Sequence, residues 1–174
     1  MKRLYFKRAL ALVLTLMLLI GSVPAGSLAA ETRYNDTSGH WAASAIDQWS
    51  DYGVLNGHAG SFRPGDPITR GEMAAVLTRV IGWAAAGKNR FSDVDSGKWY
   101  YEYVVKLAAA GIMVGADGKA RPQDNITREE AATLFARAFT LPEKTDDPHP
   151  FKDADRISAW AAGYVGGLHT AGYL

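Results

Sequence analysis

The chain has 174 residues, of which 19 are Lys or Arg and 18 are Asp or Glu, and it contains no cysteine. The lack of cysteine excludes a disulfide framework and a thiolate metal site. The balanced charge excludes the strongly basic surface that binds nucleic acid or anionic membranes.

Residues 1–30 have the layout of a secretory signal peptide. Four basic residues come first, an apolar run follows at residues 9–20, and small residues at 27–29 offer a cleavage site. The apolar run is shorter than the roughly 20 residues that a membrane-spanning helix needs. We therefore expect a signal-peptide helix that is removed on export, with no membrane contact afterwards. The remaining 15 basic and 18 acidic residues give a charge of −3.

The rest of the chain repeats itself. The motif Ile-Thr-Arg-Gly-Glu at residues 68–72 returns as Ile-Thr-Arg-Glu-Glu at residues 126–130, 58 positions later, and a third copy begins at Phe151. A single unit of this length would be only marginally stable alone, so we expect the copies to share a core. We divide the chain into a signal peptide, two repeats, a Pro-rich linker and a partial third repeat: residues 1–30, 31–86, 87–141, 142–150 and 151–174.

Each repeat is predicted to begin with a short helix. Apolar residues follow a tryptophan at helical spacing, and a glycine stands where a left-handed cap would end the helix. The three tryptophans are Trp41, Trp99 and Trp160, and the three glycines are Gly53, Gly111 and Gly172.

A second helix follows an irregular loop in the first two repeats. Thr69 and Glu72 have the spacing of a capping box, as do Thr127 and Glu130. Gly71 is expected to weaken the first turn. The loops at 57–67 and 115–125 lack the alternation of strands, so the predicted fold is all-α. The stripes expected to face inward are Met73, Val76, Leu77 and Val80, and Ala131, Leu134, Phe135 and Ala138.

The ordered motifs resemble the S-layer homology domain over residues 34–83, 91–139 and 151–174. The set that carries the resemblance is Phe91-Ser92-Asp93, Trp99, Gly111-Ile112, the loop at 118–122 and Ile126-Thr127-Arg128-Glu129-Glu130. The resemblance implies helix-loop-helix units packed as a pseudo-threefold bundle. It also implies a secreted module that anchors proteins non-covalently to the bacterial cell wall. Such domains bind a pyruvylated secondary cell-wall polysaccharide in grooves between repeats. The ligand-binding residues implied are Arg70, Arg128, Asp36, Trp41, Asp93, Trp99, Asp153 and Trp160.

The residue types support that chemistry in part. Arg70 and Arg128 stand at helix N-termini, where unpaired N–H groups and a guanidinium favour a carboxylate. The other interpretation is an exposed Arg or one paired with a neighbouring acid. The tryptophans can stack on a sugar or belong to the core. The aspartates can bind sugar hydroxyls, or cap a helix and hold a loop.

We expect no catalysis, no metal and no cofactor. The four histidines have no paired spacing. There is no Gly-flanked Ser elbow and no phosphate loop. The alternative function is docking to a protein or to peptidoglycan without pyruvylated-sugar specificity, and a wall-acting hydrolase is a distant third.

The third copy stops at Leu174, before its loop and its Thr-Arg-x-Glu helix. We therefore expect one groove to be absent or impaired and one apolar helix face to be poorly covered. Self-association could cover that face.

Overall fold

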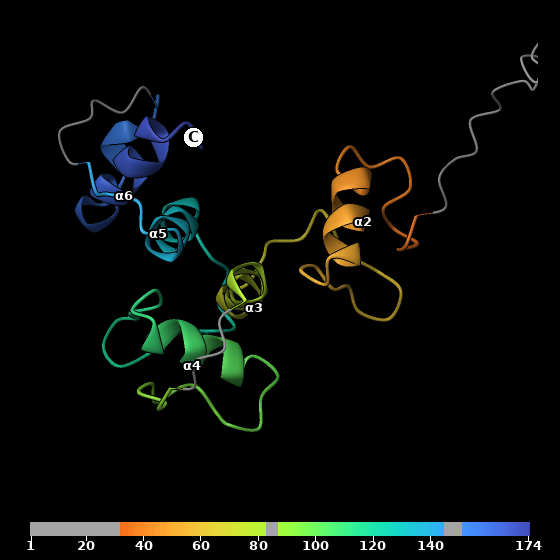
Figure 1. Ribbon diagram of the computed structural model, residues 1–174, viewed down its shortest axis with the longest axis horizontal. Coiled ribbons are helices and arrows are strands. Elements are labelled where there is room, and N and C mark those ends of the chain that lie inside the picture. Colours follow the sequence, from red (N-terminus) through yellow and green to blue (C-terminus); the bar gives the residue numbers. More distant parts are fainter. Residues whose placement is uncertain (1–31, 83–86, 145–150) are drawn as a thin grey trace, which may run out of the picture. The chain divides into compact units, whose positions relative to one another are not determined.

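The computed structural model describes residues 32–82, 87–144 and 151–174 (Figure 1). The predicted signal peptide and most of the predicted linker lie outside these residues. Secondary structure in the described ranges is helical, apart from isolated β-bridges in the loops. This confirms the all-α class; the pseudo-threefold packing and the division into repeats stay predictions. No helix in the described ranges is long and apolar enough to cross a membrane.

Helices alternate along the chain as the repeats predict. The first helices of the three repeats are α2 (Ala43–Asp51), α4 (Tyr101–Ala109) and α6 (Ala159–Thr170). The second helices are α3 (Arg70–Ile81) and α5 (Arg128–Ala138), and a short 3-10 turn, η1 (Ala154–Arg156), precedes α6.

The predicted capping boxes start both second helices. The N–H of Glu72 donates to Thr69 Oγ1 at 3.2 Å, and the N–H of Thr69 donates to the Glu72 carboxylate at 2.8 Å. Thr127 and Glu130 form the same pair of bonds at the start of α5. Each box satisfies two backbone donors that a bare helix end would leave open.

The glycines that end the first helices adopt the expected left-handed conformation. Gly53, Gly111 and Gly172 have φ values of 71°, 72° and 77°. A side chain at these positions would be strained, which explains why each copy has glycine there.

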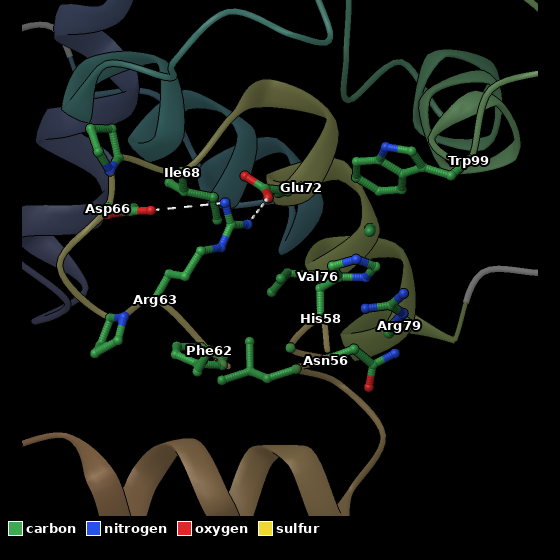
Figure 2. Close-up of a pocket in the computed structure, with 15 residues that line it drawn as sticks. Asn56, His58, Phe62, Arg63, Asp66, Ile68, Glu72, Val76, Arg79 and Trp99 are labelled. Carbon is green, nitrogen blue, oxygen red and sulfur yellow. Dashed lines mark hydrogen bonds and ion pairs between the residues drawn. The ribbon is translucent and has the colours of Figure 1, made fainter. Parts of the chain in front are cut away.

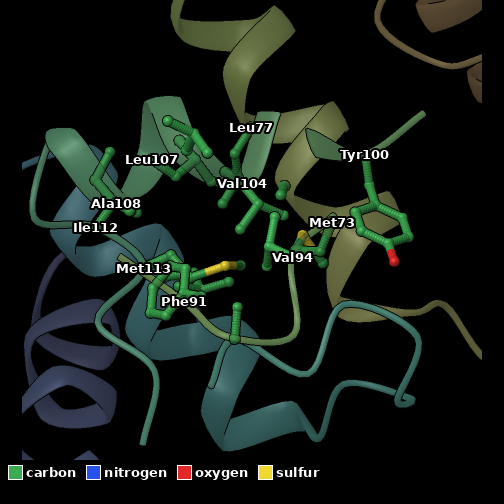
Figure 3. Packing of buried hydrophobic residues seen from close by; sticks show 14 residues of the cluster. Met73, Leu77, Phe91, Val94, Tyr100, Val104, Leu107, Ala108, Ile112 and Met113 are labelled. Atoms are coloured by element: carbon green, nitrogen blue, oxygen red, sulfur yellow. The ribbon is translucent and has the colours of Figure 1, made fainter. Parts of the chain in front are cut away.

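The main core is shared between the first two repeats, as expected (Figure 3). Helix α3 packs against α4 and α5, and α5 packs against α6. Leu77 of the first repeat is fully buried among second-repeat side chains, including Val104, Leu107 and Met113. The second helix of one repeat therefore packs on the first helix of the next.

The same pair of arginine contacts occurs at both boundaries between repeats. The Arg79 guanidinium lies 5.0 Å from the Tyr103 ring centroid and donates to Val54 O at 3.1 Å. The Arg137 guanidinium lies 4.7 Å from the Tyr164 centroid and donates to Ile112 O at 3.4 Å. Cation–π stacking with a carbonyl contact thus fixes one repeat on the next.

Part of the predicted inward stripe is wrong. Val80 is exposed, and Val76, Ala131, Phe135 and Ala138 are only half-buried, whereas Ala74 and Ala75 are buried. The helix face that is covered depends on where the next repeat lies, and the periodicity of one helix does not contain that information.

The interpretation of Gly71 as a weak point is also wrong. Its N–H donates to Pro122 O at 2.8 Å, and a Cβ here would lie 2.9 Å from that oxygen and 3.2 Å from the Tyr100 Cβ. Glycine therefore lets the loop of the second repeat reach the start of α3, which offsets its low helix propensity.

Candidate functional site

The two arginines predicted to bind a ligand lie in opposite environments. Arg70 is only 6% exposed, because its Nε donates to Ala120 O at 2.8 Å and its guanidinium pairs with Glu130 at 2.7 Å. The backbone N–H of Arg70 donates to Asp124 O at 2.9 Å. The N-terminus of α3 is therefore closed to an external anion, and the acid-paired interpretation describes Arg70.

Arg128 is exposed, although it occupies the same position of the motif on α5. Within the described residues its side chain has no hydrogen bond or ion pair, and the backbone N–H groups of Arg128 and Glu129 have no acceptor. This helix start keeps the open donors that favour a negative group.

Two of the predicted aspartates hold loops in shape. The Asp36 carboxylate accepts the N–H groups of Phe62 at 2.8 Å and Arg63 at 2.7 Å. Asp93 accepts those of Ala120 at 2.9 Å and Arg121 at 2.7 Å. Hydrogen bonds to the charged form, led by that of the Phe62 N–H, lower the pKa of Asp36 below its ordinary 3.8.

The hydrogen bonds to Asp36 and Asp93 hold residues whose backbone is in the left-handed conformation. Arg63 and Arg121 have φ values of 61° and 53°, a conformation that costs energy for a residue with a side chain. The loop-holding interpretation therefore describes Asp36 and Asp93. Asp153 differs, because it is exposed and its side chain makes no capping bond to η1.

The three predicted tryptophans lie outside the core. Trp41 is 91% exposed, Trp99 59% and Trp160 53%. Of the three, Trp99 lines a groove of about 560 Å³ between the first-repeat loop and α3 (Figure 2). We call this cavity the first groove. Trp99 belongs to the second repeat, whereas the other lining residues of this groove belong to the first repeat.

The first groove combines aromatic and charged side chains. Phe62 and Trp99 supply rings. The polar side chains of the lining are those of Asn56, His58, Arg63, Asp66, Glu72 and Arg79. Such a mixture suits a sugar, which presents apolar ring faces and many hydroxyls.

Arg63 is the accessible cation of this groove. Its side chain is 57% exposed, and its guanidinium lies 3.8 Å from the Asp66 carboxylate and 3.4 Å from that of Glu72. Exposed pairs of this kind contribute little stability, so a ligand carboxylate can compete for the guanidinium. Arg79, by contrast, also donates to the Tyr103 hydroxyl at 3.1 Å, which fixes its position.

Three groove residues, His58, Arg63 and Arg79, were not predicted from the sequence. A signal for two of them was present, because the 58-residue shift carries Arg63 onto Arg121 and Arg79 onto Arg137. His58 gave no such signal, since its counterpart is Ala116.

The corresponding surface of the second repeat has different chemistry. Ala116 and Ala120 stand in place of His58 and Phe62. Glu130 is shared between Arg70 at 2.7 Å and Arg121 at 3.2 Å. The two repeats therefore do not offer equivalent sites. Among the described residues, no cluster of three or more His, Asp or Glu side chains is arranged to hold a metal ion.

Comparison with known proteins identifies the repeats. Residues 33–74 and 90–132 match the model of the S-layer homology domain family. Both matches fall on the two repeats that contain a Thr-Arg-x-Glu helix.

Several surface proteins and an enzyme are similar to most of the chain. The surface-layer 125 kDa protein of Lysinibacillus sphaericus is 34% identical over 145 residues, which cover 82% of this chain and 12% of that protein. Exoglucanase XynX of Acetivibrio thermocellus is 29% identical over 90% of this chain and 15% of its own length. The S-layer protein sap of Bacillus anthracis is 26% identical over 88% of this chain and 19% of its own. The chain thus spans less than a fifth of each of these relatives.

Proposed function

We propose a function from one premise, which is that this chain belongs to the S-layer homology domain family. Domains of this family are cell-wall anchoring modules, and the relatives include S-layer and other surface proteins. The expected location at the bacterial cell surface agrees with these relatives. The chain anchors itself, or a protein joined to it, to the cell wall and has no catalytic activity of its own.

The ligand in this proposal is a secondary cell-wall polysaccharide, bound in the first groove. The observation that carries the proposal is the exposed Trp99 indole, which shares a groove with the charged side chains Arg63 and Arg79 (Figure 2). The indole stacks on the apolar face of a sugar ring, while the polar side chains bind its hydroxyls.

The pyruvyl group of such a polysaccharide carries a carboxylate, and Arg63 is the cation that binds it. Displacing Arg63 from its exposed partners costs little. Displacing Glu130 from Arg70 would leave a buried charge unpaired, at a cost of about 3–5 kcal/mol. One charge-assisted hydrogen bond returns only about 1.5–3 kcal/mol, so Arg70 does not exchange its partner for a ligand.

Sedimentation with purified cell walls tests the site. Trp99→Ala and Arg63→Ala should each weaken wall binding about tenfold, which corresponds to roughly 1.4 kcal/mol. Trp41→Ala is the matched control, because it removes an exposed indole that does not line the first groove. Equal binding by all three variants would remove the first groove from the proposal.

A second comparison separates the proposed ligand from its alternatives. Binding should fall when the secondary polysaccharide is stripped chemically from the walls. Binding that persists on stripped walls would point to peptidoglycan or to a wall protein. Release of soluble sugars during the incubation would contradict the absence of catalysis.

A further inference from the structure

His58 is a titratable residue of the first groove to which the proposed function gives no specific role. Its imidazole points from the first-repeat loop into the groove, toward the part of the lining that contains Arg79 and Trp99 (Figure 2). The residue is exposed, and among the described residues its side chain has no hydrogen bond, ion pair or ring contact. A ligand in the groove can therefore bind the imidazole without displacing a partner within the protein.

A tight turn fixes the backbone of His58 at the groove. His58 and Ser61 exchange both backbone hydrogen bonds, at 2.9 Å and 3.0 Å. The two residues between them, Ala59 and Gly60, have φ values of 49° and 80°, as the two central residues of a type I′ turn do. Because this turn is already formed, little backbone freedom is lost when the imidazole contacts a ligand.

The second repeat forms the same turn without a histidine. Ala116 and Lys119 exchange the two backbone bonds at 3.0 Å and 2.9 Å, and Asp117 and Gly118 have φ values of 50° and 68°. An alanine is therefore sufficient for the fold of this loop. The imidazole of His58 is an addition to the first groove that the turn itself does not require.

The other charges of the groove lining balance each other. They are two cations and two anions, and the lining residue from the second repeat, Trp99, is uncharged: Arg63 and Asp66 come from the loop, and Glu72 and Arg79 from α3. Carboxylates ordinarily titrate at about pH 4 and guanidinium groups above about pH 12, whereas histidine changes its charge between about pH 5 and 8. The Phe62 N–H lowers the pKa of Asp36, which holds the same loop, so that carboxylate also keeps its charge in this interval. A proton on His58 thus gives the lining a net positive charge.

We propose that His58 is a further ligand contact of the first groove, and that its protonation tightens the binding of an anionic glycan as the pH falls from about 8 to about 5.5. The imidazolium adds a positive charge and an N–H donor to the groove in which Arg63 binds the ligand carboxylate. Protonation and ligand binding are linked, so each strengthens the other by the same factor. This inference rests on the proposed function, because it concerns the same groove and the same class of ligand.

Sedimentation with purified cell walls at about pH 5.5 and about pH 8 tests the inference. The unsubstituted chain should bind about fivefold more tightly than His58→Gln at the lower pH, which is the size expected of one exposed charge pair, and about equally at the higher pH. Titration of groups in the wall itself affects both proteins alike, so it cancels in this ratio. The turn does not need the histidine, so His58→Gln should keep the helical circular dichroism of the unsubstituted chain.

His58→Lys is the complementary variant, because its charge is present at both pH values. It should bind more tightly than His58→Gln at the higher pH as well as at the lower. If His58→Lys bound no better than His58→Gln at the higher pH, the charge at this position would have no effect and the inference would be wrong.

His40 supplies a matched control from the same repeat. It does not line the first groove, and its Nδ1 accepts the N–H of Ala42 at 3.2 Å, a bond that protonation of this nitrogen would break. His40→Gln should keep the pH dependence of the unsubstituted chain. A dependence that is lost in His40→Gln and kept in His58→Gln would place the titrating group beside the start of α2 and overturn the inference.

The outcomes separate this inference from the proposed function. Wall binding whose pH dependence is the same in the unsubstituted chain and in His58→Gln would overturn the role of His58 and leave the anchoring function standing. Failure of the unsubstituted chain to bind walls at either pH would overturn both together.

Discussion

The arginine of the Thr-Arg-x-Glu motif has two different environments in one chain. Arg70 and Arg128 follow the same threonine and precede the same capping glutamate, so local sequence gives both the same helix start. Their surroundings differ because the second repeat covers the start of α3. The motif therefore joins repeats as well as presenting a charge.

Removing one partner of the Arg70–Glu130 pair should be costly. Arg70→Ala leaves Glu130 with fewer partners in a poorly solvated position, and we expect the free energy of unfolding to fall by about 3 kcal/mol. Arg128→Ala should change it by less than about 0.5 kcal/mol, since this side chain has no partner among the described residues.

Urea denaturation of the two variants measures this difference. Glu130→Gln is a further check and should resemble Arg70→Ala. Equal stability of Arg70→Ala and Arg128→Ala would show that burial of Arg70 contributes nothing net.

At the scale of elements, the loops depend on carboxylates as much as the helices depend on caps. Asp36 spans from the start of the first repeat to Phe62 and Arg63 and holds their N–H groups in place. Because Arg63 lines the first groove, the shape of this loop also sets the position of the proposed ligand contact.

The pKa of Asp36 predicts an acid-sensitive loop. Its folded pKa lies below 3.8, so the carboxylate contributes stability above that value. The contribution is lost as the pH falls from about 4 through the folded pKa. Asp36→Asn should flatten this part of the pH dependence of the free energy of unfolding.

Denaturation between pH 2 and pH 7 gives the measurement. Asp155→Asn serves as a control, because it removes an exposed carboxylate of η1 that has no hydrogen bond or ion pair among the described residues. An unchanged pH profile for Asp36→Asn would contradict this role.

The elements were predictable to different degrees. Capping boxes placed the starts of α3 and α5 at the correct residue, because both partners of each box are local. The starts of α2 and α4 lie two residues after their tryptophans, and neither has a side-chain cap that the sequence could reveal.

At the scale of the whole molecule, the site was less predictable than the fold. Trp99 was found because it repeats, yet it lines the same groove as Arg63 only because the two repeats pack together. The burial of Arg70 was equally hidden, since its partners lie 50 and 60 positions away at Ala120 and Glu130. Such contacts follow from packing between repeats, which the pattern within one repeat cannot specify.

Because the loops of the first two repeats differ in sequence, we expect the tryptophans to contribute unequally to cell-wall binding. In the second-repeat loop, alanines stand at the positions of Phe62 and His58, so these two side chains are not available to act together with Trp160. Trp160→Ala should therefore weaken wall sedimentation by less than about threefold, against about tenfold for Trp99→Ala. A larger loss for Trp160→Ala would place the main sugar contact at the second repeat.

The Arg70–Glu130 contact also constrains how the protein folds. These residues are 60 positions apart and belong to different repeats. The first repeat folding by itself would therefore keep a charged helix start whose carboxylate partner is missing. Folding of the first repeat is thus completed only when the second repeat has come to lie against it.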